Sequence, residues 1–271
     1  MKDPRQALAA GRSDNVLFSM PHLPISASAG RFAAEFATAL AEHGLTMVAH
    51  LTGFPCRSLV DVCASVDASA VVGLESFAPE TTAALRRAGV ATVLSLGDDA
   101  SGPDQVVARL QADHLLSRGH CRIGFAPPAQ RVPQHMPLAR LRGVEDACAA
   151  AGLEPPSALT VEPVAADAAR AVAEWRDRSV SAVAAYNDET ALAVLAGLRT
   201  LGLTAPDDMA VIGVDDIPTA ALAAPPLTTI AFDFSNAAYR LAQAVTATLR
   251  GEQPQEAKIS YRPHVVERES A

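Results

Sequence analysis

Acidic residues directly follow two apolar runs of the sequence that predict buried strands. Asp215 and Asp216 come after the run at 210–214, and Asp188 comes shortly after the run at 182–185. In α/β proteins, ligand sites gather at the carboxyl ends of strands. Neighbouring strand residues point to opposite sides, so the two carboxylates cannot readily converge on one bond. We therefore expect one of them to face a ligand and the other to cap the next helix, with Asp188 as a helix N-cap.

The sequence lacks the motifs that carry most catalytic chemistry. It has no glycine-rich nucleotide loop, no esterase elbow and no zinc-protease motif, and its seven histidines are scattered. Its four cysteines form no CxxC pair, which favours reduced thiols. A hydrolase that uses Asp215 and Asp216 would need a nucleophile and base that this pattern does not supply. We expect no catalytic residues, no metal and no cofactor, so the chain is not predicted to be an enzyme.

Short runs typical of strands alternate with stretches of helical period along the chain. Six glycines stand where these helices should end, namely Gly44, Gly89, Gly119, Gly152, Gly202 and Gly251. The predicted strands are 16–20, 46–51, 70–74, 92–96, 122–126, 158–161, 182–185, 210–214, 228–231 and 259–262. The predicted helices are 30–43, 79–88, 105–118, 138–151, 167–178, 188–201 and 235–250.

This alternation predicts an α/β fold with parallel sheets. So many strands are better divided between two subdomains than placed in one open sheet. A proline-rich stretch at 127–137 interrupts the alternation near the middle of the chain. Two such subdomains would bind a small molecule at the carboxyl ends of their strands.

Composition limits the classes of partner. The 271 residues include 22 Lys and Arg against 30 Asp and Glu, a formal net charge of −8, and 49% are hydrophobic. This much apolar material excludes a disordered chain, and the acidic balance excludes a non-specific nucleic-acid binder. No secretory signal or membrane-length apolar run occurs, so we expect a cytoplasmic protein with no membrane partner.

Four motifs in order lie within residues 185–233. They are an AxND helix start at Asn187–Asp188, a G-x-x-x-P-x-D turn at 202–209, a V-x-G-x-D-D strand end at 211–216 and a PPLTT segment at 225–229. Two further matches run through 114–125 and 140–153. Together they closely resemble the effector-binding core of the lactose/galactose repressor (LacI/GalR) family of bacterial transcription regulators.

The resemblance implies two Rossmann-like subdomains of the periplasmic-binding-protein-like type I fold, joined by three crossovers. One would comprise 16–121 plus 231–250, and the other 122–230 plus 251–271. Residues 1–15 resemble the family's hinge helix, in which Leu8 matches the leucine that enters the DNA minor groove. The family places a helix-turn-helix domain before that hinge; we expect it to be missing here, so operator DNA would be a partner only through that domain.

The resemblance also implies ligand contacts. Arg140 matches the arginine of an R-L-x-G motif, Asn187 the asparagine of AxND, Asp215 the first aspartate of the D-D pair, and Phe232 a position that contacts ligand in some members. These residue types suit a sugar or similar polyol. Tyr186 is a candidate for the aromatic side chains that the family's pocket commonly has.

Together these features predict a dimeric, effector-sensing core of a regulator, expected to be a repressor. The alternative is a periplasmic-type solute-binding protein for sugars, which shares the fold but needs an export signal.

Overall fold

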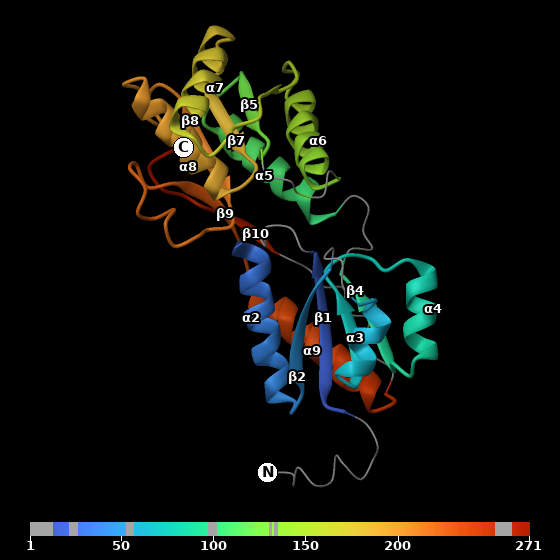
Figure 1. Cartoon of the computed structure of the whole chain (residues 1–271). Coiled ribbons are helices and arrows are strands. Elements are labelled where there is room, and N and C mark those ends of the chain that lie inside the picture. Colours follow the sequence, from blue (N-terminus) through green and yellow to red (C-terminus); the bar gives the residue numbers. More distant parts are fainter. Residues whose placement is uncertain are drawn as a thin grey trace. The chain divides into compact units, whose positions relative to one another are not determined.

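The chain forms two α/β units in the computed structural model (Figure 1). The structure describes residues 13–21, 27–52, 57–96, 102–129, 132, 135–252 and 262–271. One unit takes the chain up to residue 100 and again from 233 to 261, and the other takes 101–232 and 262–271. The chain therefore passes three times between the units. Leu8 and nearly all of the predicted hinge lie outside the described residues.

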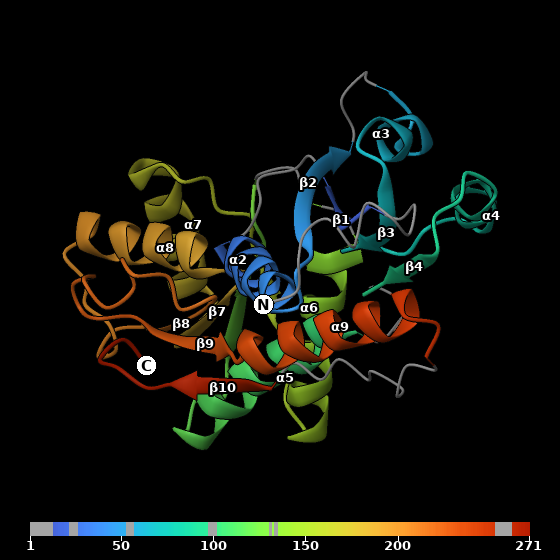
Figure 2. The same cartoon turned by 90° about the horizontal axis from the view of Figure 1, so that it is seen from below.

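The first unit is a four-stranded parallel sheet in the order β2-β1-β3-β4. Helices α2 and α9 pack together on one face, and α3 and α4 on the other (Figure 2). Neighbouring residues of β1 supply both cores, because Leu17 packs with Leu85 of α4 while the ring of Phe18 meets those of Phe32 and Phe36 in α2. The elements are β1 (Asn15–Pro21), α2 (Ala27–Glu42), β2 (Thr46–Thr52), α3 (Leu59–Ser65), β3 (Ala68–Gly73), α4 (Pro79–Arg87), β4 (Thr92–Ser95) and α9 (Phe234–Leu249).

The second unit is a six-stranded sheet in the order β10-β9-β8-β7-β5-β6, parallel except for β10, which runs antiparallel to β9. Helices α7 and α8 pack against each other, as do α5 and α6, and each pair covers its own apolar cluster of the sheet. The elements are α5 (Pro103–Ser117), β5 (Ile123–Ala126), α6 (His135–Ala150), β6 (Ser157–Ala158), α7 (Ala165–Asp177), β7 (Ala182–Ala185), α8 (Asp188–Thr200), β8 (Ala210–Val214), β9 (Thr228–Phe232) and β10 (Pro263–Val266).

Most predicted elements agree with the structure to within three residues at each end, but the predicted strand 158–161 shares only residue 158 with β6. Helix α3 is not among the predicted elements. The predicted strand 259–262 lies, apart from Arg262, outside the described residues, and β10 follows it. Helix α5 packs on α6 and on β7, β8 and β9 of the second unit, whereas the predicted boundary after 121 placed it in the first subdomain. The glycines expected at helix ends all have positive φ, between 69° and 93°, which confirms that prediction.

Close helix packing explains two of the remaining glycines. A Cβ on Gly143 of α6 would meet the backbone of Gln105 in α5, and one on Gly197 of α8 would lie 2.6 Å from the backbone carbon of Ala168 in α7. Helices that approach this closely leave no room for a side chain. Among the described residues, no helix is long and apolar enough to cross a membrane.

We predict that Gly197→Ala lowers the free energy of unfolding by about 1–3 kcal/mol, because α7 and α8 must separate to admit the methyl group. Urea unfolding followed by the fluorescence of Trp175, the chain's one tryptophan, measures this change. Gly30→Ala in α2 is the control, since nothing lies within 4 Å of the added carbon. The urea concentration at the unfolding midpoint of Gly30→Ala should stay the same or rise. Equal losses of unfolding free energy in both variants would contradict the packing argument.

Candidate ligand site

Three of the predicted ligand residues lie where the parallel strands of the second sheet end, at their carboxyl ends. Strands β7 and β8 are parallel neighbours, so the segments that follow them begin side by side. Asn187 follows β7 after one residue, and Asp215 follows β8 directly. Arg140 reaches the same end of the sheet from α6, because its guanidinium bonds to the residue between β7 and Asn187.

Arg140 is buried, and two of its three guanidinium nitrogens are hydrogen-bonded within the protein. Its Nε donates to Asp104 Oδ1 at 2.7 Å, and its Nη1 donates to the carbonyl oxygen of Tyr186. Its guanidinium carbon lies 4.3 Å from the centre of the Tyr186 ring, a cation–π contact. Burial opposes its charge, but the carboxylates of Asp104 and Asp215 and the nearby Tyr186 raise the pKa of Arg140 above its ordinary value.

Tyr186 supports Arg140 rather than opening toward a ligand. It is 5% exposed, and its hydroxyl lies 3.9 Å from the sulfur of Met136. Burial raises the pKa of Tyr186 to about 12, so the phenol stays neutral. Its position just past β7 is the signal for it in the sequence, which predicts an aromatic side chain of the pocket and not a support for Arg140.

Asp215 and Asp216 form a turn in an unusual backbone conformation, with φ of 113° and 49°. Non-glycine residues rarely adopt positive φ, and aspartate is among those that tolerate it best. The turn is held by the Asp215 amide, which donates to Ile230 O at 2.9 Å, and by Arg268, whose Nη2 donates to Asp216 Oδ1 at 2.7 Å. Asp215 is 4% exposed and acts electrostatically on Arg140, whereas Asp216 forms an ion pair instead of the expected helix cap.

Asp188 supports the Asp215 turn through a hydrogen bond from the residue that follows the turn. It is fully buried, and its carboxylate accepts from Thr229 Oγ1 at 2.5 Å and from the Ile217 amide at 2.9 Å. The prediction that Asp188 is a helix N-cap is wrong, because Asn187 occupies that position. Both residue types cap helices equally well, so the sequence could not decide between them.

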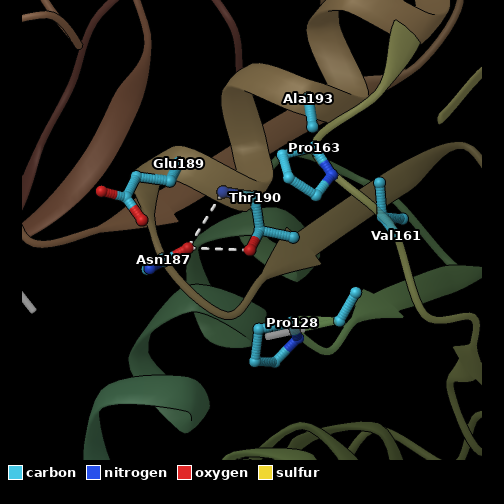
Figure 3. A pocket seen from close by; sticks show the side chains of 8 residues that line it. Pro128, Val161, Pro163, Asn187, Glu189, Thr190 and Ala193 are labelled. Carbon is cyan, nitrogen blue, oxygen red and sulfur yellow. Dashed lines mark hydrogen bonds between the residues drawn. The ribbon is translucent and has the colours of Figure 1, made fainter. Parts of the chain in front are cut away.

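The Asn187 side chain caps helix α8 and also lines a small pocket. Its Oδ1 accepts from the Thr190 amide at 2.9 Å and from Thr190 Oγ1 at 2.8 Å, and its nitrogen points away from Thr190 (Figure 3). Because the oxygen is committed to the cap, the amide presents a donor to a ligand. The pocket beside it is lined by Pro128, Ala129, Val161, Pro163, Asn187, Glu189, Thr190 and Ala193.

The fourth predicted ligand residue, Phe232, ends β9, which is the parallel neighbour of β8, so it lies at the same carboxyl end of the sheet as Asp215. Its ring packs against the apolar cluster beneath α5, and its ligand role stays a prediction. Leu8 lies outside the described residues. Within the described part of the chain, no three His, Cys, Asp or Glu side chains are grouped so that they could hold a metal ion.

Two mainly parallel sheets with helices on both faces, and a polar group at the strand ends of one, are typical of α/β ligand-binding proteins. A family model described as the periplasmic binding protein-like domain matches residues 112–271. The chain belongs to this family, and within it the chain is similar to transcription regulators of the LacI/GalR type.

Relatives and solved structures agree with this assignment. The regulator GalR of Escherichia coli K12 is 29% identical over 171 residues, which cover 62% of this chain and 49% of GalR. MalR of Streptomyces coelicolor is 34% identical over 138 residues, which cover 48% of this chain and 39% of MalR. The chain thus spans about half or less of the curated relatives it matches.

Two solved structures share the fold. The complex of the transcriptional regulator CelR with cellobiose matches with a TM-score of 0.75 and 25% identity, covering 98% of this chain and 89% of CelR. The lac repressor dimer bound to operator and the anti-inducer ONPF matches with a TM-score of 0.72 and 20% identity, covering 100% and 86%. The proteins named here are transcription regulators, which favours the regulator over the solute-binding alternative.

Burial of Asp188 predicts a pH-dependent stability. Burial raises the pKa of Asp188 from 3.8 to about 7, although hydrogen bonds from Thr229 and Ile217 favour its charged form. The folded chain therefore keeps this proton where the unfolded chain has released it, which favours folding below about pH 4 and is lost progressively as the pH rises to 7.

We predict that the melting temperature falls less between pH 5 and pH 8 in Asp188→Asn than in the parent chain, because asparagine does not titrate. Asp207→Asn, at an exposed position, is the matched control and should follow the parent. Parallel curves for the parent and Asp188→Asn would show that Asp188 does not titrate in this range.

Proposed function

We propose that this chain is the sensory core of a transcription regulator. It binds a small polar effector, most simply a carbohydrate, at the carboxyl ends of the strands of its second sheet. The observation that carries the proposal is that Arg140, Asn187 and Asp215 lie together at the carboxyl ends of two adjacent strands, with the charge of Asp215 acting on Arg140. CelR, a structural relative, was solved with a sugar. We propose no catalytic role.

The three side chains suit a ligand rich in hydroxyl groups. A carboxylate accepts hydrogen bonds from two neighbouring hydroxyls, a guanidinium donates, and the Asn187 amide supplies a further donor. The positions of Arg140 and Asp215 are fixed by Tyr186 and by the contacts of the Asp215 turn. Groups held in place before binding lose little conformational entropy when the ligand arrives.

Regulation would follow from a difference in affinity. An effector shifts an equilibrium between two conformations only as far as it binds one of them more tightly. In the proposed protein, this shift would change operator binding by a helix-turn-helix domain, expected to act as a repressor. The charge of −8 belongs to the sensory core and gives it no general attraction to DNA.

We further propose that the chain forms a homodimer through the edge of its first sheet. Strand β2 ends the described sheet and contains no Lys, Arg, Asp or Glu, and Leu51 on it is 37% exposed. Uncharged edge strands pair readily with another chain, and charged side chains usually block such pairing.

Leu51→Lys should therefore convert a dimer to a monomer in size-exclusion chromatography with light scattering. The control is Ala83→Lys, on the exposed side of α4, which should stay dimeric. A dimer that persists in Leu51→Lys would place the interface elsewhere, and a parent chain that is monomeric would remove the dimer from the proposal.

Thermal-shift screening tests the ligand site. We predict that an uncharged sugar from a panel that includes cellobiose, lactose, galactose and ribose raises the melting temperature, since a ligand at 100 times its dissociation constant adds about 2.7 kcal/mol. Asp215→Asn and Arg140→Lys should each strongly reduce the shift, because one loses the charge and the other the fixed fork of donors.

Two exposed neighbours serve as controls for these variants. Arg142→Lys on α6 and Asp207→Asn before β8 should respond like the parent chain. If Asp215→Asn and Arg140→Lys keep the full shift, the ligand binds at another place and the site is misassigned.

A further inference from the structure

Asp104 occupies the edge of Arg140 that would otherwise bind an anion. A guanidinium grips phosphate or carboxylate with two parallel N–H groups. Here Nε donates to Asp104 Oδ1 at 2.7 Å, and Nη1 donates to the Tyr186 carbonyl. The Arg140 side chain is 8% exposed and that of Asp104 is 20% exposed, so the pair lies at the border between protein and solvent.

The pair is held by the packing of α5 on α6. Asp104 is in the first turn of α5, where the helix dipole favours a carboxylate. The next residue, Gln105, donates to Asp146 Oδ2 of α6 at 2.6 Å. Gly143 lets the two helices approach to backbone contact at Gln105. Asp104 therefore has little freedom to leave Arg140 when a ligand arrives.

The fixed charges around Arg140 exclude a second anion. Within the second unit, one guanidinium faces two carboxylates, those of Asp104 and Asp215. A phosphate or carboxylate on a ligand would be repelled by both carboxylates. Asp104 also already occupies the Nε side of the guanidinium. An uncharged hydroxyl meets no such repulsion and can bond to Asp215.

We propose that Asp104 is a specificity-determining residue, which keeps Arg140 neutralised so that the site accepts uncharged polyols and rejects phosphorylated or carboxylated ones. The inference rests on the proposed function for the location of the site. Asp104 acts through Arg140 and is therefore a positioning residue.

Inorganic phosphate is the probe. Its binding shows whether the guanidinium of Arg140 is free to bind an anion, whatever the natural effector is. Calorimetric titration should show that Asp104→Ser binds phosphate at least about tenfold more tightly than the parent chain. Asp104→Asn, which removes the charge and keeps the size, should gain in the same direction. Adding Arg140→Gln to Asp104→Ser should abolish the gain.

Asp113→Ser is the matched control, since Asp113 lies on the same helix in an exposed pair with Arg109. It should bind phosphate as weakly as the parent does. The proposal is overturned if Asp104→Ser and Asp104→Asn bind no better than Asp113→Ser, or if the gain survives Arg140→Gln. Failure of the proposed function appears separately, as a sugar response that is independent of Arg140 and Asp215.

Discussion

One buried carboxylate joins the parts of the second unit that form the ligand site. Asp188 begins α8, receives a hydrogen bond from β9 through Thr229, and receives another from the Ile217 amide beyond the Asp215 turn. A buried carboxyl group is costly unless it is hydrogen-bonded, so these contacts link α8, β9 and the segment after the turn. Gly213 belongs to the same arrangement, because a Cβ there would overlap Asp188 Oδ1.

The remainder of the site depends on this arrangement. The turn at Asp215 and Asp216 has a strained backbone that persists only when surrounding contacts determine it. The Ile230 carbonyl and Arg268 supply contacts within the turn, and Asp188 bonds the residue that follows it. Once the turn is fixed, Asp215 lies near Arg140, and Tyr186 and Asp104 fix Arg140 in turn. The site thus consists of two charged groups, each held by its own set of neighbours.

Much of this could be predicted from local sequence. Strand ends and helix ends follow from short apolar runs and from glycines, and the carboxyl ends of parallel strands indicate where Asn187 and Asp215 must lie. Trp175, on the predicted helix 167–178, is fully buried and donates to Ser157 O at 2.8 Å. These features depend on neighbours in the sequence or on the regular geometry of the sheet.

Several of the features that were missed depend on residues far apart in the chain. Arg268 meets Asp216 across 52 positions and Asp104 meets Arg140 across 36, and no periodicity reveals such pairs. The placement of α5 depends likewise on its packing against α6, which a boundary drawn from motifs does not contain.

The central claim is that Arg140 and Asp215 act together on one ligand. A double-mutant cycle with Arg140→Lys and Asp215→Asn, measured by calorimetric titration of the uncharged sugar that binds the parent chain most tightly, tests it most directly. If the two side chains share a ligand, the losses in binding free energy should be non-additive by about 0.5–3 kcal/mol. Strictly additive losses, or no loss in either variant, would contradict the account.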